Sequence, residues 1–288
     1  MDDGVGISGA TAPQACYVLE RRTTDDWGET EEWFYATELT HSPWGLNVQH
    51  GGPVAGLLCR TLERCGLIPG TRLARLTVDL LGPVPATTVK VRSWVERPGT
   101  KVALLIAEMW APAPGGGPWR PVARAQAWRL ATGDSTEVAA AADPSRGFPG
   151  GRPLPLPDAW TVGFINAVNW HVATPIGNPG GPTLAWLSLK VPLVAGEAPS
   201  PLTALMSVSD IANGLGARVD PFEWTFLNTE LTVHLFGPPA QGWVGLECET
   251  SMGDDGIAMT AGVIHSPGRP LGRIAQCVLL ERRPVRAG

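Results

Sequence analysis

An internal repeat constrains the fold of this chain more than any other feature of its sequence. Residues 76–83 (LTVDLLGP) match residues 231–238 (LTVHLFGP) at an offset of 155. Two shorter matches occur in the same order: the pattern Gly-Leu-x-x-Arg at residues 56–60 and 214–218, and the pair Ala-Gln at residues 125–126 and 275–276. Three matches in one order predict a duplication of a single unit, with connecting loops of slightly different length.

Each copy contains one segment with helical character. Residues 50–65 place apolar side chains at helical spacing and end before Gly66, the expected C-terminal glycine. The second segment, about residues 207–218, begins with hydroxyl and carboxylate side chains and is otherwise built from small residues. Helices this poor in large side chains can lie very close to a sheet.

The remaining periodic segments predict strands. In the first copy these are residues 16–19, 33–39, 72–81, 88–96, 101–110 and 122–130. In the second copy they are residues 164–174, 183–191, 224–235, 243–250, 257–265 and 272–281. Because each copy has only one long helix, that helix must pack on one face of a largely antiparallel sheet, which makes the fold class α+β.

A segment of different composition separates the two copies. Residues 132–158 are rich in Ala, Pro, Gly and Arg, and each proline biases its predecessor away from helix. We therefore expect an N-terminal domain at residues 1–135, a Pro/Gly-rich linker at 136–158 and a C-terminal domain at 159–288.

Composition argues against several classes of partner. The net charge is −5 and no basic stripe stands out, which argues against nucleic acid. No apolar run is long enough to span a bilayer and the N-terminus lacks the features of a secretory signal, so we expect a cytoplasmic protein with no membrane partner. The five cysteines lack a C-x-x-C pair and the five histidines lack metal-ligand spacing, so we expect reduced core thiols, no metal and no cofactor.

Asp210 is the main candidate for a catalytic residue. The sequence contains no G-x-S-x-G elbow for a nucleophilic serine. The other route to ester or thioester hydrolysis uses a carboxylate that deprotonates a water. An Asp near the start of a helix can also be a simple N-cap, although Ser207 and Ser209 can take that role instead.

Several short motifs resemble one known family. They are Trp44, the run His50-Gly51-Gly52-Pro53, Asp210, residues 226–229 and Gln276. With them the chain resembles the TesB-like (type II) acyl-CoA thioesterase family. The resemblance implies a double hotdog fold, in which two tandem repeats each wrap a curved antiparallel sheet around a central helix. It also implies hydrolysis of acyl-CoA to free acid and CoA, and a homodimer or higher homo-oligomer.

The resemblance also implies roles for individual residues. It places a catalytic Asp at Asp210 and a catalytic Gln at Gln276, although the matching Gln126 leaves a purely structural role open for Gln276. The family's hydroxyl-bearing Thr falls on Asn228, with Thr229 adjacent. Because successive strand residues point to opposite faces, only one of these two can face the site.

The start of the first helix supplies candidate substrate-binding residues. Gly51 and Gly52 allow close backbone approach, which can bring N–H groups to a ligand oxygen or tighten helix packing. His50 is a candidate base, but the sequence shows no evident acidic partner for it. Gly52 occupies the position that matches Asp210, so the first copy lacks the carboxylate.

Two other functions compete with thioester hydrolysis. Enoyl-CoA hydration needs a His about one helical turn after the Asp, and the corresponding positions here are Asn213, Gly214 and Leu215. A non-catalytic acyl-CoA-binding or acyl-ligand-binding hotdog protein is the second alternative, and the departure at Asn228 is the reason to consider it.

Overall fold

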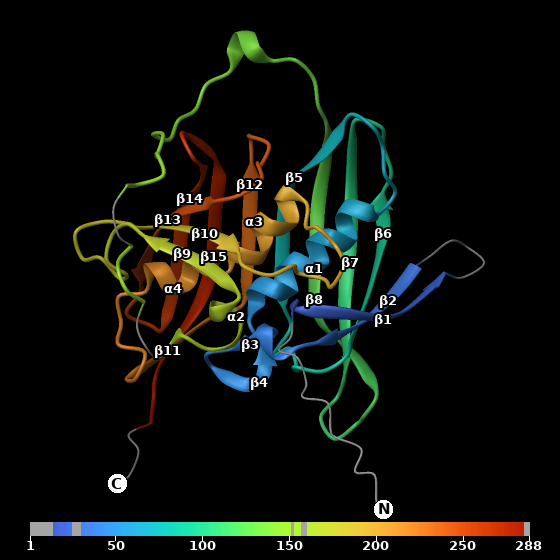
Figure 1. Cartoon of the computed structure of the whole chain (residues 1–288), viewed down its shortest axis with the longest axis horizontal. Coiled ribbons are helices and arrows are strands. Elements are labelled where there is room, and N and C mark those ends of the chain that lie inside the picture. Colours follow the sequence, from blue (N-terminus) through green and yellow to red (C-terminus); the bar gives the residue numbers. More distant parts are fainter. Residues whose placement is uncertain (1–13, 25–29, 151–152, 157–159, 285–288) are drawn as a thin grey trace, which may run out of the picture.

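The computed structural model describes residues 14–24, 30–150, 153–156 and 160–284 (Figure 1). Residues 1–13 of the expected N-terminal domain, and residues 151–152 and 157–158 of the expected linker, lie outside the described residues.

The first copy forms the elements that its sequence predicts, with small shifts at their ends. It begins with a strand pair and a short turn of helix: β1 (Tyr17–Thr24), β2 (Thr30–Ala36) and η1 (Glu38–Thr40). A small hairpin leads into the first helix: β3 (His41–Ser42), β4 (Gly45–Gln49) and α1 (Gly51–Arg64). Four long strands complete the copy: β5 (Thr71–Leu80), β6 (Val89–Arg97), β7 (Val102–Pro112) and β8 (Trp119–Ala131).

The second copy follows the same plan with a divided helix and a divided strand. After η2 (Thr136–Val138) come α2 (Gly163–Asn166), β9 (Val168–Val172), β10 (Thr183–Leu189), α3 (Pro201–Ser209) and α4 (Ala212–Gly216). The strands that follow are β11 (Trp224–Asn228), β12 (Glu230–Leu235), β13 (Val244–Met252), β14 (Ile257–Ser266) and β15 (Arg269–Arg282).

The strand order repeats between the copies. In the first copy the order across the sheet is β1-β2-β6-β7-β8-β5, and in the second it is β9-β10-β13-β14-β15-β12, with β11 paired beside β12 on β15. An antiparallel ladder between β5 and β12 joins the two halves into one sheet of 13 strands.

The ladder between β5 and β12 relates the copies by an approximate two-fold axis. Thr77 lies opposite Thr232, its own counterpart at the offset of 155, and the two hydroxyl oxygens are 3.1 Å apart. One step away, Leu76 pairs with Val233 and the counterpart of Leu76, Leu231, pairs with Val78. Such reciprocal pairing is the signature of an isologous interface. The duplication predicted from the sequence is therefore confirmed.

The long helices lie on one face of this sheet (Figure 1). Helix α1 packs on the strands of the first half, and α3 and α4 pack on those of the second half. The side chain of His50 caps α1 by accepting a hydrogen bond from the Gly52 N–H, and Gly66 follows the helix with φ at +48°. The prediction of one central helix per half, packed on an antiparallel sheet, is confirmed for the first copy.

Small residues bring α1 and α3 into close contact. A Cβ atom added at Gly52 would meet the backbone oxygen of Ser207, and one added at Gly56 would meet the Ser207 hydroxyl. At the other end of the pair, Glu63 of α1 accepts hydrogen bonds from the hydroxyls of Ser200 and Thr203. The start of α1 therefore lies beside the end of α3, and the two helices run antiparallel.

A buried ion cluster ties α1 to its surroundings. The Arg60 guanidinium donates to Glu32 of β2 and to Glu197 before α3, each at 2.6 Å. The hydrogen bond from Arg60 holds the pKa of Glu197 down to about 2. Arg218, which matches Arg60 in the Gly-Leu-x-x-Arg pattern, lies 3.6 Å from Glu249 and donates to the Gly181 carbonyl oxygen at 3.4 Å, so it takes no part in this cluster.

Two predicted elements of the second copy are wrong in their bounds. The helix does not begin at Ser207: Ser200 caps α3, Pro201 is its first residue, and Asp210 stands at its C-terminal end. The helix then resumes as α4, so Asp210 is no N-cap. Residues 164–174 were expected to form one strand, but Phe164 lies in the short helix α2 and β9 begins only at Val168.

All five cysteines are free thiols. Four are buried as expected, and burial raises the pKa of Cys16 to about 12. Cys277 is exposed on β15, so the prediction of core thiols is wrong for that residue.

Candidate active site

Asp210 lies where the end of α3 meets the start of α1. A Cβ atom added at Gly51 would stand 2.6 to 2.8 Å from the three atoms of the Asp210 carboxyl group. The carboxylate therefore covers the first residue of α1, where the positive end of the helix dipole favours a negative charge. The side chain is only 6% exposed.

Three polar side chains contact the Asp210 carboxylate. Asn228 Nδ2 donates to Oδ1 at 2.7 Å, and Gln276 Nε2 approaches the same oxygen at 3.3 Å. His50 Nδ1 lies 3.1 Å from the other oxygen, Oδ2. The structure thus supplies the acidic partner for His50 that was not evident in the sequence, from a helix that begins 150 residues further along the chain.

Asn228, and not Thr229, faces this cluster. Asn228 is the last residue of β11, two residues after the buried Phe226. The two side chains therefore share the inner face of the sheet, which is the face that the helices cover. Thr229 is exposed, and its hydroxyl lies 3.5 Å from the Cys277 carbonyl oxygen. The expectation that Thr229 can orient a water in the site is not supported by this geometry.

Gln276 carries an unpaired polar atom at the site. Its side chain is fully buried, and its Oε1 has no hydrogen-bond partner among the described residues. Buried side-chain oxygens are rarely left unpaired, so such an atom calls for an explanation. An amide that donates to Asp210 and offers a free acceptor beside it is suited to hold a water molecule.

The register of the sheet corrects the match between Gln126 and Gln276. Thr77 and Thr232 are counterparts, and they lie opposite Gln126 and Ala275 respectively. Gln126 therefore corresponds to Ala275 on the outer face, and the counterpart of Gln276 is the next residue, Ala127. A shift of one residue moves a strand side chain to the opposite face. The match with Gln126 is therefore wrong, and it gives no reason to assign Gln276 a purely structural role.

The same register reveals a polar row that the sequence did not predict. Thr250 of β13, Thr260 of β14 and Gln276 of β15 lie opposite one another on the inner face. Their counterparts in the first copy are Val95, Leu105 and Ala127, which are all apolar. The second half alone carries polar side chains at these positions, on the same side of the sheet as Asp210.

A directed chain of hydrogen bonds runs from this row to the strand that holds Asn228. The Thr250 and Thr260 hydroxyls are 2.7 Å apart, and the Thr260 hydroxyl lies 3.5 Å from Asn213 Oδ1. Asn213 Nδ2 in turn donates to the Phe226 carbonyl oxygen at 3.1 Å. The chain links β13, β14, α4 and β11, the strand that ends at Asn228.

Aromatic residues lie beside the cluster. Trp44, from the β3–β4 turn, packs edge-on against Phe226 with ring centroids 4.9 Å apart, and the Arg283 guanidinium lies over the Trp44 ring at 5.3 Å. Trp44 is partly exposed, so this corner of the site reaches the surface.

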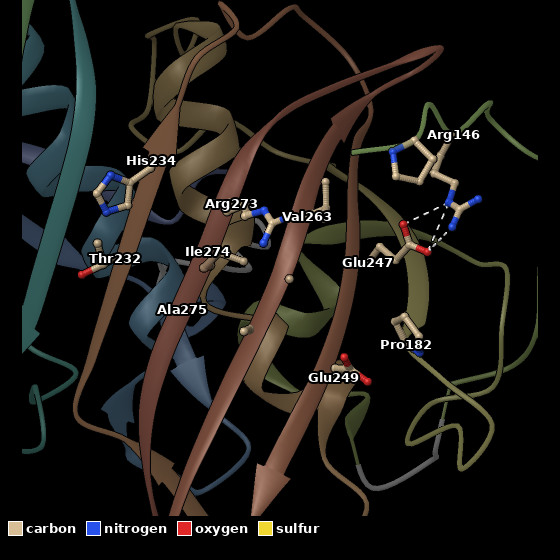
Figure 2. A pocket seen from close by; sticks show the side chains of 13 residues that line it. Arg146, Pro182, Thr232, His234, Glu247, Glu249, Val263, Arg273, Ile274 and Ala275 are labelled. Atoms are coloured by element: carbon tan, nitrogen blue, oxygen red, sulfur yellow. Dashed lines mark hydrogen bonds and ion pairs between the residues drawn. The ribbon is translucent and has the colours of Figure 1, made fainter. Parts of the chain in front are cut away.

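A separate groove of about 500 Å³ lies on the opposite, outer face of the second half (Figure 2). Its lining includes His234, Val263 and Pro182, and its charged side chains are engaged in the ion pairs Arg146–Glu247, Arg273–Asp143 and Arg218–Glu249. The first two of these pairs fasten the segment between the two copies, which arches above the upper ends of the strands in Figure 1. None of the predicted site residues lines this groove.

Comparison with known proteins identifies the family. The sequence model of the acyl-CoA thioesterase N-terminal domain matches residues 40–130, and that of the C-terminal domain matches residues 148–280. The chain belongs to the acyl-CoA thioesterase family. Thioester hydrolysis with acyl-CoA as the substrate class follows from this membership, and the two competing functions find no support in it.

Solved structures confirm the fold of this acyl-CoA thioesterase. A hotdog-fold protein of unknown function from Alicyclobacillus acidocaldarius superposes with a TM-score of 0.66 at 15% identity, covering 93% of this chain and 96% of the other. The acyl-CoA thioesterase II TesB2 from Mycobacterium marinum gives 0.63 at 14% identity, covering 93% and 97%. The tesB protein from Mycobacterium avium subspecies paratuberculosis gives 0.59 at 12% identity, covering 92% and 96%. The fold is a double hotdog, as predicted.

Two further observations complete the comparison. Among curated proteins, no sequence matches this chain. Within the described residues, no helix combines the length and the hydropathy needed to cross a membrane.

Proposed function

We propose that this enzyme hydrolyses acyl-CoA by direct attack of a water molecule on the thioester carbonyl. Asp210 is the general base that takes the proton from the water. Gln276 and Asn228 hold the carboxylate, and Gln276 also holds the water. The observation that carries the proposal is the buried, unpaired Oε1 of Gln276, in a side chain whose amide nitrogen already reaches Asp210.

The contacts of Asp210 suit a general base. Both amide donors are neutral, so they orient Oδ1 without neutralising the charge. The N-terminus of α1 adds a favourable electrostatic interaction. Asn228 fills the position of the family's hydroxyl residue with an amide donor at 2.7 Å, so the departure from the pattern preserves a hydrogen bond to the base.

The start of α1 is the proposed binding site for the thioester carbonyl. The run from His50 to Gly52 adjoins the carboxylate, and glycines without a Cβ allow a ligand oxygen to approach backbone N–H groups at a helix N-terminus. Donors of this kind stabilise the negative charge that develops on the carbonyl oxygen. The first copy has Ala127, Val95 and Leu105 where the second has Gln276, Thr250 and Thr260, so we propose a single active site per chain.

The test is release of free thiol from a panel of acyl-CoA substrates of different chain lengths. Removing a general base typically costs 10²- to 10⁴-fold in rate, so we expect Asp210→Asn to lose about that factor in kcat while its melting temperature stays close to wild type. Full activity in that variant would refute the assignment. Thermal stabilisation of the wild-type protein by acyl-CoA without thiol release would instead favour a binding protein. The expected homodimer or larger assembly and the cytoplasmic location remain predictions.

A further inference from the structure

Two groups compete for one ring nitrogen of His50. The Gly52 N–H points at Nδ1 from 3.0 Å, and Asp210 Oδ2 lies 3.1 Å from the same atom. An imidazole nitrogen carries either a lone pair or a proton. It can accept from Gly52 or donate to Asp210, but it cannot do both at once.

The two hydrogen bonds therefore define two states of one geometry. Without a proton, Nδ1 accepts from Gly52 and caps α1. With a proton, Nδ1 donates to Asp210 and the Gly52 N–H is released. The ring is held in place, since the His50 backbone N–H donates to the Thr40 carbonyl oxygen at 2.8 Å and the Phe164 ring packs against the imidazole at 5.2 Å. Passing between the states requires movement of a proton and little movement of the ring.

We propose that His50 stores the proton that Asp210 removes from the attacking water. The proposal rests on the assignment of Asp210 as the base. As the water oxygen bonds to the thioester carbon, its proton passes to Asp210 Oδ2 and on to His50 Nδ1, which exchanges its bond to Gly52 for one to Asp210. When the carbon–sulfur bond breaks, the proton returns through Asp210 to the departing thiolate, and the products are the free acid and the CoA thiol.

The surroundings of the ring suit this role. An imidazole is in general a stronger base than a carboxylate, so it is the better acceptor for a proton taken from water. Asp210, from the end of α3, is the charged group within ion-pair distance of the ring. Phe164 from α2 and Gly52 from α1 also face the ring, and neither carries a charge.

The experiment separates proton storage from helix capping. Asn is among the best N-cap residues, so His50→Asn keeps an acceptor for the Gly52 N–H but cannot take up a proton. The matched control is His234→Asn, because His234 lies on the outer face of the sheet, in the groove of Figure 2. Thiol release is measured for both variants and for wild type as kcat and KM between pH 5 and 9, together with melting temperatures.

We expect His50→Asn to melt near wild type, to lose on the order of 10²-fold in kcat and to change KM by less than about three-fold. His234→Asn is unchanged. Wild-type kcat in His50→Asn, or a loss of activity that appears in KM and not in kcat, would show that His50 only caps the helix and would overturn the inference. Failure of the proposed function itself shows separately, as an active Asp210→Asn variant.

Discussion

Replacing Gly51 by Ala should impair catalysis without unfolding the protein. The nearest carboxyl atom of Asp210 lies 2.6 Å from the position of the new Cβ, whereas ordinary contact begins at 3.4 Å, so the carboxylate must retreat by about 0.8 Å. The new Cβ lies at similar distances from all three carboxyl atoms, so the carboxylate cannot escape by rotating one oxygen away. A misplacement of about 1 Å at a reacting group costs up to about 10²-fold in rate. We expect kcat to fall by about 10- to 100-fold.

The stability of the Gly51→Ala variant should change little. Gly51 does not adopt a positive φ, so Ala fits its backbone conformation. Ala is favoured over Gly in a helix by about 0.5–1 kcal/mol, which offsets the displacement of one side chain. The free energy of unfolding, measured by urea denaturation, should therefore stay within about 1 kcal/mol of wild type.

Gly56→Ala is the matched control, because its Cβ would meet the buried Ser207 side chain away from the carboxylate. Overpacking of this kind costs about 1–3 kcal/mol, so this variant should lose stability while its folded fraction keeps kcat. Wild-type kcat in Gly51→Ala would show that the position of the carboxylate over α1 is unimportant, and the reasoning about the site would fail.

Two further predictions concern the polar row and the ion cluster. Thr260→Val keeps the shape of the side chain but leaves the Thr250 hydroxyl and Asn213 Oδ1 without their partner. We therefore expect the free energy of unfolding, measured with urea, to fall by about 1–3 kcal/mol, and kcat to fall as well. Unchanged stability and rate would show that the polar row contributes neither to stability nor to catalysis. Glu197→Gln removes a carboxylate whose pKa is lowered to about 2, mainly by the Arg60 hydrogen bond. Because the folded-state pKa lies below the ordinary 4.5, the stabilisation is present above that value and is lost as pH falls towards 2. The deficit of this variant in unfolding free energy should therefore be full at pH 7 and shrink at pH 3, and a pH-independent deficit would contradict the assignment.

Local patterns predicted most of the elements and part of the site. Apolar spacing and Gly66 located α1, and the repeat at an offset of 155 predicted the duplication that the pairing of Thr77 with Thr232 confirms. The start of α3 was missed although its signal is present in the sequence, since Ser200 followed by Pro201 is a typical helix start. The run of small residues at 207–218 drew the prediction towards the middle of the helix.

The parts that sequence could not predict depend on tertiary packing. His50 meets Asp210 only because two antiparallel helices from different copies approach at glycines, and no local pattern encodes that contact. The correct counterpart of Gln276 depends on sheet register, which the short Ala-Gln match misassigned by one residue. The polar row of Thr250 and Thr260 becomes evident only when the same register is used to compare the two copies.

The central claim is that water attacks the thioester directly, with Asp210 as base and not as nucleophile. The most direct measurement is a single turnover in ¹⁸O-labelled water with enzyme in excess over acyl-CoA, followed by mass spectrometry of the fatty acid and of the peptide that contains Asp210. Direct attack predicts one ¹⁸O atom in the acid and none in the peptide. An unlabelled acid together with ¹⁸O in the Asp210 carboxyl group would show a covalent anhydride and contradict the account.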